Sequence, residues 1–131
     1  MNVHDYHLNS YTVDCSASSI QMRFTWPYDE KKKSKEITFS GVAGYNFKDA
    51  LGSVIFGLEE KQIKAFIDEY ASEFSASYKS FGFPAFWREN KQSTMDELNG
   101  YKVWMIDSSI GFDGWVIARS VSEADPVAVR Q

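Results

Sequence analysis

The most regular stretch of the sequence runs from Glu59 to Phe81, where apolar side chains recur every three or four residues. This spacing places them on one side of a helix with about 3.6 residues per turn. They are Ile63, Phe66, Ile67, Tyr70, Phe74, Tyr78 and Phe81. An apolar face of this width must be covered in water, so the stretch predicts a long helix packed against a sheet or a partner.

The two ends of this helix carry different signals. We expect the helix to begin at Glu59 and Glu60, because carboxylates in a first turn interact favourably with the positive end of the helix dipole. Gly82 readily adopts the left-handed conformation that closes helices. Pro84 then prevents continuation, since proline has no amide hydrogen to donate.

A second, shorter helix is predicted to start at Thr94. Thr94 and Glu97 have the spacing of a capping box, in which each side chain bonds the backbone amide of the other residue. Asn99 and Gly100 follow almost at once and end the helix.

Short alternating or apolar segments on both sides of the long helix predict strands. Ile20, Met22 and Phe24 alternate with polar residues, as in a strand with one dry face. The predicted strands are Tyr6–Asp14, Ile20–Trp26, Glu36–Val42, Ser53–Gly57, Tyr101–Asp107 and Asp113–Arg119. The glycine-punctuated stretch Gly41–Gly52 is interpreted as a loop.

The last two of these strands form a closing hairpin that we expect to be buried on both faces. Val103 and Met105 lie on one face, and Trp104 and Ile106 lie on the other. The predicted fold class is therefore α+β, a mostly antiparallel twisted sheet of about six strands with the long helix across one face. The order is four strands, the long helix, a short helix and two strands.

The length and the absence of linkers predict a single domain over residues 1–131. We expect residues 1–4 and 120–131 to fray, since the last segment is polar and contains Pro126.

Charge and hydropathy exclude two classes of partner. A formal net charge of −4 disfavours a duplex nucleic-acid binder, which needs a dense positive surface to neutralise phosphates. No apolar run approaches the roughly 20 residues that span a bilayer, so we expect no membrane partner.

The first residues lack the basic and apolar regions of a signal peptide, which predicts a cytoplasmic protein.

Residues that carry chemistry are sparse. Cys15 is the only cysteine, so neither an intrachain disulfide nor a cysteine zinc cluster is possible. His4 and His7 are the only histidines, and both stand near the amino terminus, where we interpret them as surface residues. Asp107 and Asp113 flank the turn of the closing hairpin and suit turn formation. We therefore predict no catalytic residue, no cofactor and no metal site.

The most apolar loop of the chain follows the long helix. Phe83, Phe86 and Trp87 surround a proline there, and Arg88 comes next. Either these side chains fold back as a lid over one end of the core, or some stay exposed as an interface. Tryptophan and arginine dominate binding hot spots, which favours this loop as a recognition surface. The candidate binding residues are Phe83, Phe86, Trp87 and Arg88, with Trp26 and Tyr28 as a second, weaker set.

Together these features predict a non-enzymatic interaction module whose partner is another protein or a second copy of the chain. In a general way its balance resembles the small, acidic bacterial proteins that include the immunity proteins of toxin systems, although no motif is specific to them. That resemblance implies inhibition of a basic toxin. The alternative is a small-molecule-binding or hydrolytic protein with a pocket between helix and sheet, lined by Tyr70, Tyr78, Trp104 and Trp115.

Overall fold

The computed structural model describes residues 3–28, 33–48, 55–108 and 113–124, which form eight strands and two helices. In chain order they are β1 (His7–Asp14), β2 (Ser19–Thr25), β3 (Ser34–Ser40), β4 (Gly44–Lys48), β5 (Ile55–Lys61), α1 (Ile63–Phe81), α2 (Lys91–Glu97), β6 (Lys102–Ser108), β7 (Asp113–Ala118) and β8 (Ser120–Ala124).

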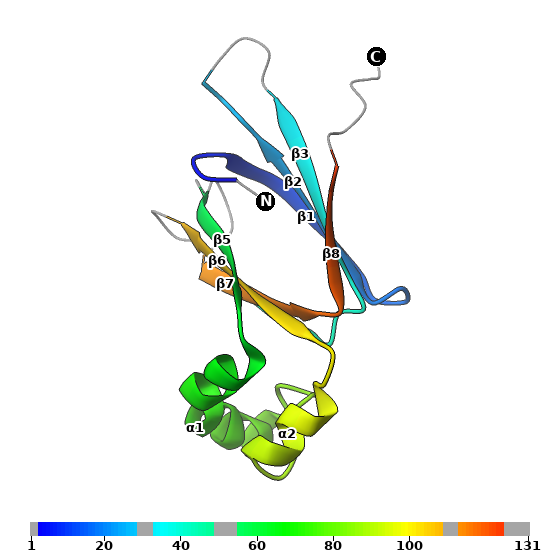
Figure 1. Ribbon diagram of the computed structural model, residues 1–131, viewed down its shortest axis with the longest axis vertical. Coiled ribbons are helices and arrows are strands. Elements are labelled where there is room, and N and C mark those ends of the chain that lie inside the picture. Colours follow the sequence, from blue (N-terminus) through cyan, green and yellow to red (C-terminus); the bar gives the residue numbers. More distant parts are fainter. Residues whose placement is uncertain (1–2, 29–32, 49–54, 109–112, 125–131) are drawn as a thin grey trace.

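The predicted α+β class is confirmed, but the prediction of one sheet is wrong. The described strands form two four-stranded sheets, ordered β1-β2-β3-β8 and β4-β7-β6-β5, and every neighbouring pair is antiparallel. Figure 1 shows the first sheet above the second, with α1 and α2 below both. The molecule therefore has three layers: a sheet, a second sheet and a helical layer.

The chain passes between the sheets at two adjoining places. Arg119 separates β7 from β8, and its backbone N–H donates to the carbonyl oxygen of Ser40 at 3.0 Å. Gly41 opens the other crossing with a φ of 63°, a left-handed conformation that glycine adopts without steric cost. A Cβ at Gly41 would also lie 3.0 Å from Cγ of Arg119, so the two crossings pack tightly together.

Two of the strands were missed by the sequence patterns. Gly44–Lys48, predicted to be part of a loop, forms β4 and pairs with β7. Ser120–Ala124, predicted to fray, forms β8 and pairs with β3, and Val3 at the other end of the chain is buried. Pairing to a preformed neighbour supplies the backbone hydrogen bonds that these short, weakly patterned segments cannot supply alone. Residues 125–131 lie outside the described part of the chain, as do residues 53 and 54 of the predicted fourth strand.

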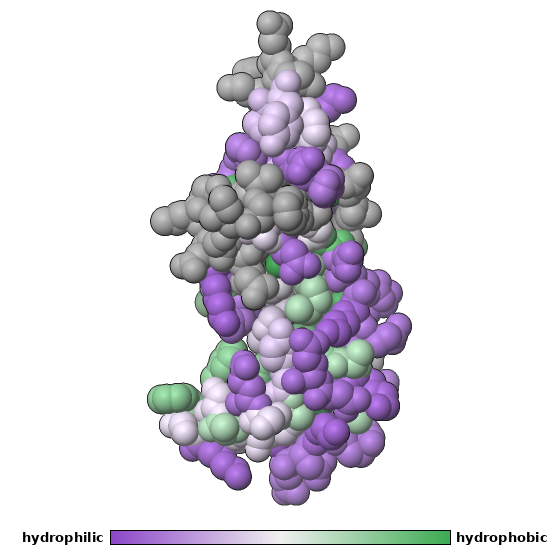
Figure 2. Space-filling view, turned by 90° about the vertical axis from the view of Figure 1, so that its left-hand side faces the viewer, coloured by the Kyte–Doolittle hydropathy of each residue, from purple (hydrophilic) through white to green (hydrophobic). Residues whose placement is uncertain are grey.

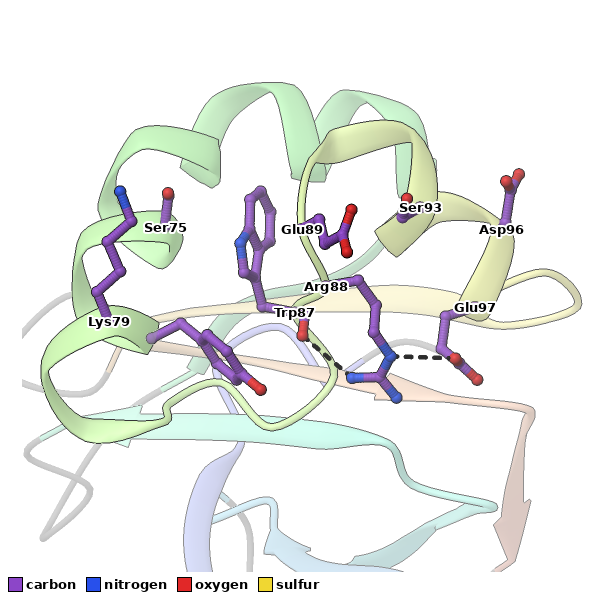
Figure 3. A pocket seen from close by; sticks show the side chains of 9 residues that line it. Ser75, Lys79, Trp87, Arg88, Glu89, Ser93, Asp96 and Glu97 are labelled. Carbon is purple, nitrogen blue, oxygen red and sulfur yellow. Dashed lines mark hydrogen bonds and ion pairs between the residues drawn. The ribbon is translucent and has the colours of Figure 1, made fainter.

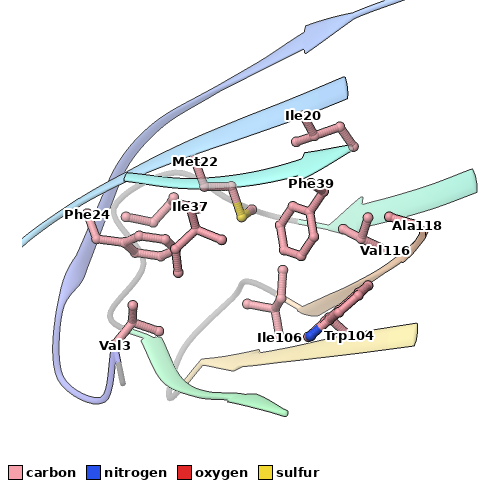
Figure 4. Packing of buried hydrophobic residues seen from close by; sticks show 11 residues of the cluster. Val3, Ile20, Met22, Phe24, Ile37, Phe39, Trp104, Ile106, Val116 and Ala118 are labelled. Carbon is pink, nitrogen blue, oxygen red and sulfur yellow. The ribbon is translucent and has the colours of Figure 1, made fainter. Parts of the chain in front are cut away.

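One hydrophobic core lies between the two sheets. Figure 4 shows Ile37 and Phe39 of β3 on one side and Trp104 and Ile106 of β6 on the other. The rings of Phe39 and Trp104 are 5.6 Å apart. The buried members are Val3, Leu8, Ile20, Met22, Phe24, Ile37, Phe39, Trp104, Ile106, Val116 and Ala118. Removing a large side chain of this kind from water contributes about 1.5–3 kcal/mol, so this interface holds the sheets together.

A second core lies between the second sheet and the helices. Its buried members are Phe66, Ile67, Phe74, Phe86, Trp87, Leu98, Val103, Trp115 and Ile117. Val103 belongs here while Trp104 belongs to the other core, so the predicted burial of the β6–β7 hairpin on both faces is confirmed. The face of the sheet opposite the helix is dry because the first sheet covers it.

The long helix is confirmed, but it begins later than predicted. It spans 19 residues from Ile63 to Phe81, and Glu59 and Glu60 belong to β5 instead, opposite Met105 and Trp104. Strand pairing with β6 outweighs the small dipole stabilisation that these carboxylates would gain in a first turn. The C-terminal prediction is confirmed, since Gly82 has a φ of 73° and donates its N–H to the carbonyl oxygen of Tyr78 at 2.8 Å.

The short helix is capped by Asn90 rather than by Thr94, and its first residue is Lys91. The Asn90 side chain accepts the backbone N–H of Ser93 at 2.9 Å, which is the usual bond of an N-cap. Thr94 lies inside α2 and is fully buried, so the predicted capping box with Glu97 is wrong. No helix in the described ranges has the length and apolar character needed to cross a bilayer.

Candidate protein-interaction surface

Phe86 and Trp87 lie in the core and not on the surface. Their exposed fractions are 5% and 4%, and their rings contact that of Phe74 at centroid distances of 5.6 and 6.3 Å. Phe86 also packs on the backbone of Gly44, where an added Cβ would lie 2.7 Å from the ring. Both rings fold back over the core, as in the lid alternative, so neither is the exposed interface residue that was predicted.

Arg88 is exposed, but its donors are used within its own segment. Nε donates to the carboxylate of Glu97 at 3.1 Å, and Nη1 donates to the carbonyl oxygens of Ala85 and Trp87 at 2.9 and 3.1 Å. Its backbone N–H donates to the hydroxyl of Thr94 at 2.9 Å. Arg88 therefore ties the loop to α2, and its role as a binding residue stays a prediction.

The exposed aromatic surface is centred just before this loop. Tyr78, Phe81 and Phe83 are 40%, 85% and 40% exposed, and we call these three residues the aromatic patch. Tyr78 and Phe81 are three residues apart and share one helix face, and Phe83 follows the left-handed turn at Gly82. Figure 2 shows green and pale surface at the lower left, over the helical end of the molecule, beside hydrophilic surface.

Only Phe83 of the aromatic patch was a predicted interface residue. The helical periodicity assigned Tyr78 and Phe81 to the buried face of α1, together with Phe66 and Phe74, which are indeed buried. The last turn of α1 has no comparable cover. The sequence feature that could have indicated the exposure of Phe81 is its position, since it is the final residue before the helix-ending Gly82.

Trp26 and Tyr28 form a separate cluster. The Trp26 ring packs on Tyr6 at 5.3 Å and on Tyr28 at 4.8 Å, which leaves Trp26 half-buried. Tyr28 is 60% exposed. Both follow the end of β2, which Figure 1 places at the end of the molecule away from the helices. The structure therefore does not bring this set together with the aromatic patch.

Next to the aromatic patch, an open furrow runs between α1 and α2. Its larger hollow has a volume of about 790 Å³, and Trp87 forms part of its lining (Figure 3). A second hollow of about 510 Å³ shares Ser75, Trp87 and Glu89 with the first, so the two hollows adjoin. The first hollow is lined by Ser75, Tyr78, Lys79, Trp87, Arg88, Glu89, Ser93, Asp96 and Glu97.

The four residues predicted to line a pocket between helix and sheet do not come together. Trp104 points into the core between the sheets, whereas Trp115 and Tyr70 pack in the core beneath α1. Tyr78 is the only one of the four predicted lining residues that borders the furrow. In the described part of the chain, side chains pack the space under α1, whereas the groove between the helices is open.

Charged side chains near the furrow form structural ion pairs. Asp68 of α1 accepts from Lys64 at 3.0 Å and from Lys91 of α2 at 3.2 Å, and these hydrogen bonds lower the pKa of Asp68 below its ordinary value. The contact with Lys91 links the two helices. Within the described ranges, no three His, Cys, Asp or Glu side chains are placed to hold a metal ion.

The chain matches no protein-family model, no curated protein and no solved structure. Arguments about its function therefore rest on its own residues.

Proposed function

We propose that the protein is a non-enzymatic interaction module that binds another protein, or a second copy of itself, through the aromatic patch. The observation that carries the proposal is the 85% exposure of Phe81, together with the 40% exposure of both Tyr78 and Phe83 in the same segment. Large aromatic side chains are enriched in binding hot spots because they bury much area at little cost in conformational entropy.

The contacts that hold the aromatic patch in place support this proposal. Phe83 lies 6.4 Å from the buried ring of Trp115, and Gly82 closes α1 through its bond to Tyr78. Phe86 and Trp87 anchor the following loop in the core. A surface that is ordered before binding loses less entropy on association, so these anchors favour recognition.

The charge of the chain favours one kind of partner. A formal net charge of −4 attracts a basic protein and accelerates their encounter. Inhibition of a basic toxin is the sharper form of the proposal. It predicts that the chain rescues cells that express a toxic protein encoded beside it, and absence of rescue would remove this form.

The proposal is tested with the double variant Phe81→Ser, Phe83→Ser and the matched control Tyr11→Ser. Tyr11 is also exposed but lies on β1 in the first sheet. For the self-binding form, sedimentation equilibrium over a concentration series should show association that the double variant weakens by roughly 100-fold and the control leaves unchanged.

For the hetero-binding form, a partner encoded beside this chain is titrated onto the same three proteins by calorimetry. Loss of affinity in the double variant alone supports the proposal. A protein that stays monomeric, and whose partner binds the double variant as tightly as the natural chain, contradicts it.

A further inference from the structure

The furrow between α1 and α2 has two chemically different sides. On α1, Ser75 and Lys79 are one turn apart and present a hydroxyl and an ammonium group (Figure 3). On the other side, Glu89 precedes α2 and Asp96 belongs to it, and both present carboxylates. One side of the furrow is therefore rich in hydrogen-bond donors and the other in acceptors.

Trp87 adds a donor to the first side. Its side chain is 4% exposed, and its indole N–H donates to no acceptor among the described residues. No buried side-chain nitrogen in the described ranges is sealed from solvent without a partner, so this N–H retains access to the hollow that Trp87 lines. In Figure 3 the ring nitrogen lies on the edge of the indole that faces Ser75 and Lys79.

Most other charges of the furrow are already neutralised. Arg88 pairs with Glu97 at 3.1 Å, and Lys91 is turned toward Asp68 at 3.2 Å. In the part of the chain that the structure describes, Lys79, Glu89 and Asp96 take part in no ion pair. The Asp96 carboxylate accepts an N–H of the Gln92 side-chain amide at 3.0 Å. The furrow therefore offers one unpaired cation at one side and two unpaired anions at the other.

We infer that this furrow binds a peptide segment of a partner protein that carries both an acidic and a basic side chain. The acid lies against Lys79 and the N–H of Trp87, and the base lies against Glu89 and Asp96. An elongated occupant fits because the two hollows adjoin at Ser75, Trp87 and Glu89. Tyr78 belongs to both the furrow and the aromatic patch, so apolar residues of the same partner reach Phe81 and Phe83. The inference rests on the proposed function, because that function makes the occupant a segment of a protein.

The test uses a phage-displayed library of random peptides selected against the natural chain, Lys79→Glu, and Glu89→Lys with Asp96→Lys. Peptides selected on the natural chain should contain Asp or Glu together with Lys or Arg. Reversal of Lys79 should replace the acidic preference by a basic one, and reversal of the two carboxylates should do the opposite. Lys48→Glu is the control, because Lys48 is exposed on β4 and does not line the furrow.

Affinities of one selected peptide are then measured by fluorescence polarisation. We expect Lys79→Glu to weaken binding roughly 10-fold, Trp87→Phe to weaken it roughly fivefold through loss of the N–H, and the control to leave it unchanged. Trp87→Phe keeps an aromatic ring in the core, and Lys79→Gln serves as a second variant if a charge reversal unfolds the chain.

Three outcomes would overturn the inference: selection of no peptide, selection of peptides without the two charges, or a peptide affinity that is the same for these variants and the natural chain. Failure of the proposed function gives a different result. In that case the variant Phe81→Ser, Phe83→Ser binds the natural partner or itself as before, whereas the charge preferences of the furrow persist.

Discussion

The hydroxyl of Thr94 accepts the backbone N–H of Arg88 at 2.9 Å and donates to the carbonyl oxygen of Asn90 at 2.8 Å. One fully buried side chain thus joins the loop that carries Phe86 and Trp87 to the first turn of α2. The arrangement of the candidate surface depends on this junction.

Thr94→Val keeps the shape of the side chain and removes both hydrogen bonds. The N–H of Arg88 is then left without its acceptor, so we expect the free energy of unfolding to fall by about 1–3 kcal/mol. Urea unfolding followed by tryptophan fluorescence measures this change. Thr94→Ser retains the hydroxyl and should lose much less, and a Thr94→Val protein as stable as the natural chain would contradict the role of these hydrogen bonds.

Gly44→Ala tests the contact between β4 and the loop. An added Cβ would lie 2.7 Å from Cε2 and 2.8 Å from Cδ2 of Phe86, so the buried ring must move. We expect a loss of about 1–3 kcal/mol in unfolding free energy. Gly57→Ala is the matched control in β5, because no atom lies within 4 Å of its added Cβ. A Gly44→Ala protein as stable as the natural chain would contradict this packing.

Phe86→Ala and Phe81→Ala should affect stability very differently although they stand in one segment. Phe86 is buried, so its truncation should cost about 3–5 kcal/mol. Phe81 is 85% exposed, so its truncation should stay within about 0.5 kcal/mol while binding is lost. Thermal unfolding of the two variants beside the natural chain checks the difference. A large loss for Phe81→Ala would mean that this ring is covered by a second copy.

Asp68 makes the link between α1 and α2 depend on pH. Its hydrogen bonds to Lys64 and Lys91 lower the folded-state pKa below the unfolded value, so their contribution to stability is present above about pH 4. The contribution disappears as the pH falls through the lowered pKa. Asp68→Asn should therefore be less stable than the natural chain at pH 7 and equally stable in strong acid.

Urea unfolding of both proteins across this pH range measures that difference, and added salt should reduce it, since the pair is exposed. Glu73→Gln is the control, because Glu73 is an exposed acid of the same helix that enters no ion pair within the described ranges. A stability difference for Asp68→Asn that persists unchanged in acid would contradict the ion-pair explanation.

The sequence by itself determined the elements whose signals are local. The spacing of Phe66, Tyr70 and Phe74 specifies a helix, because side chains three and four residues apart share one helix face whatever the rest of the chain does. Gly82 ends that helix through its own backbone freedom. Alternation in β6 likewise identified a strand with two apolar faces, and the α+β class followed from these elements.

Only the tertiary structure decided which apolar side chains are covered. Phe81 and Phe86 stand five positions apart with the same side chain, yet the first is exposed and the second is packed on Gly44 and Phe74. Glu59 joined a strand and not the predicted helix because β6 offered it a pairing partner. Burial and strand pairing depend on residues distant in the chain. No local pattern specifies which of those residues will pack or pair with a given segment.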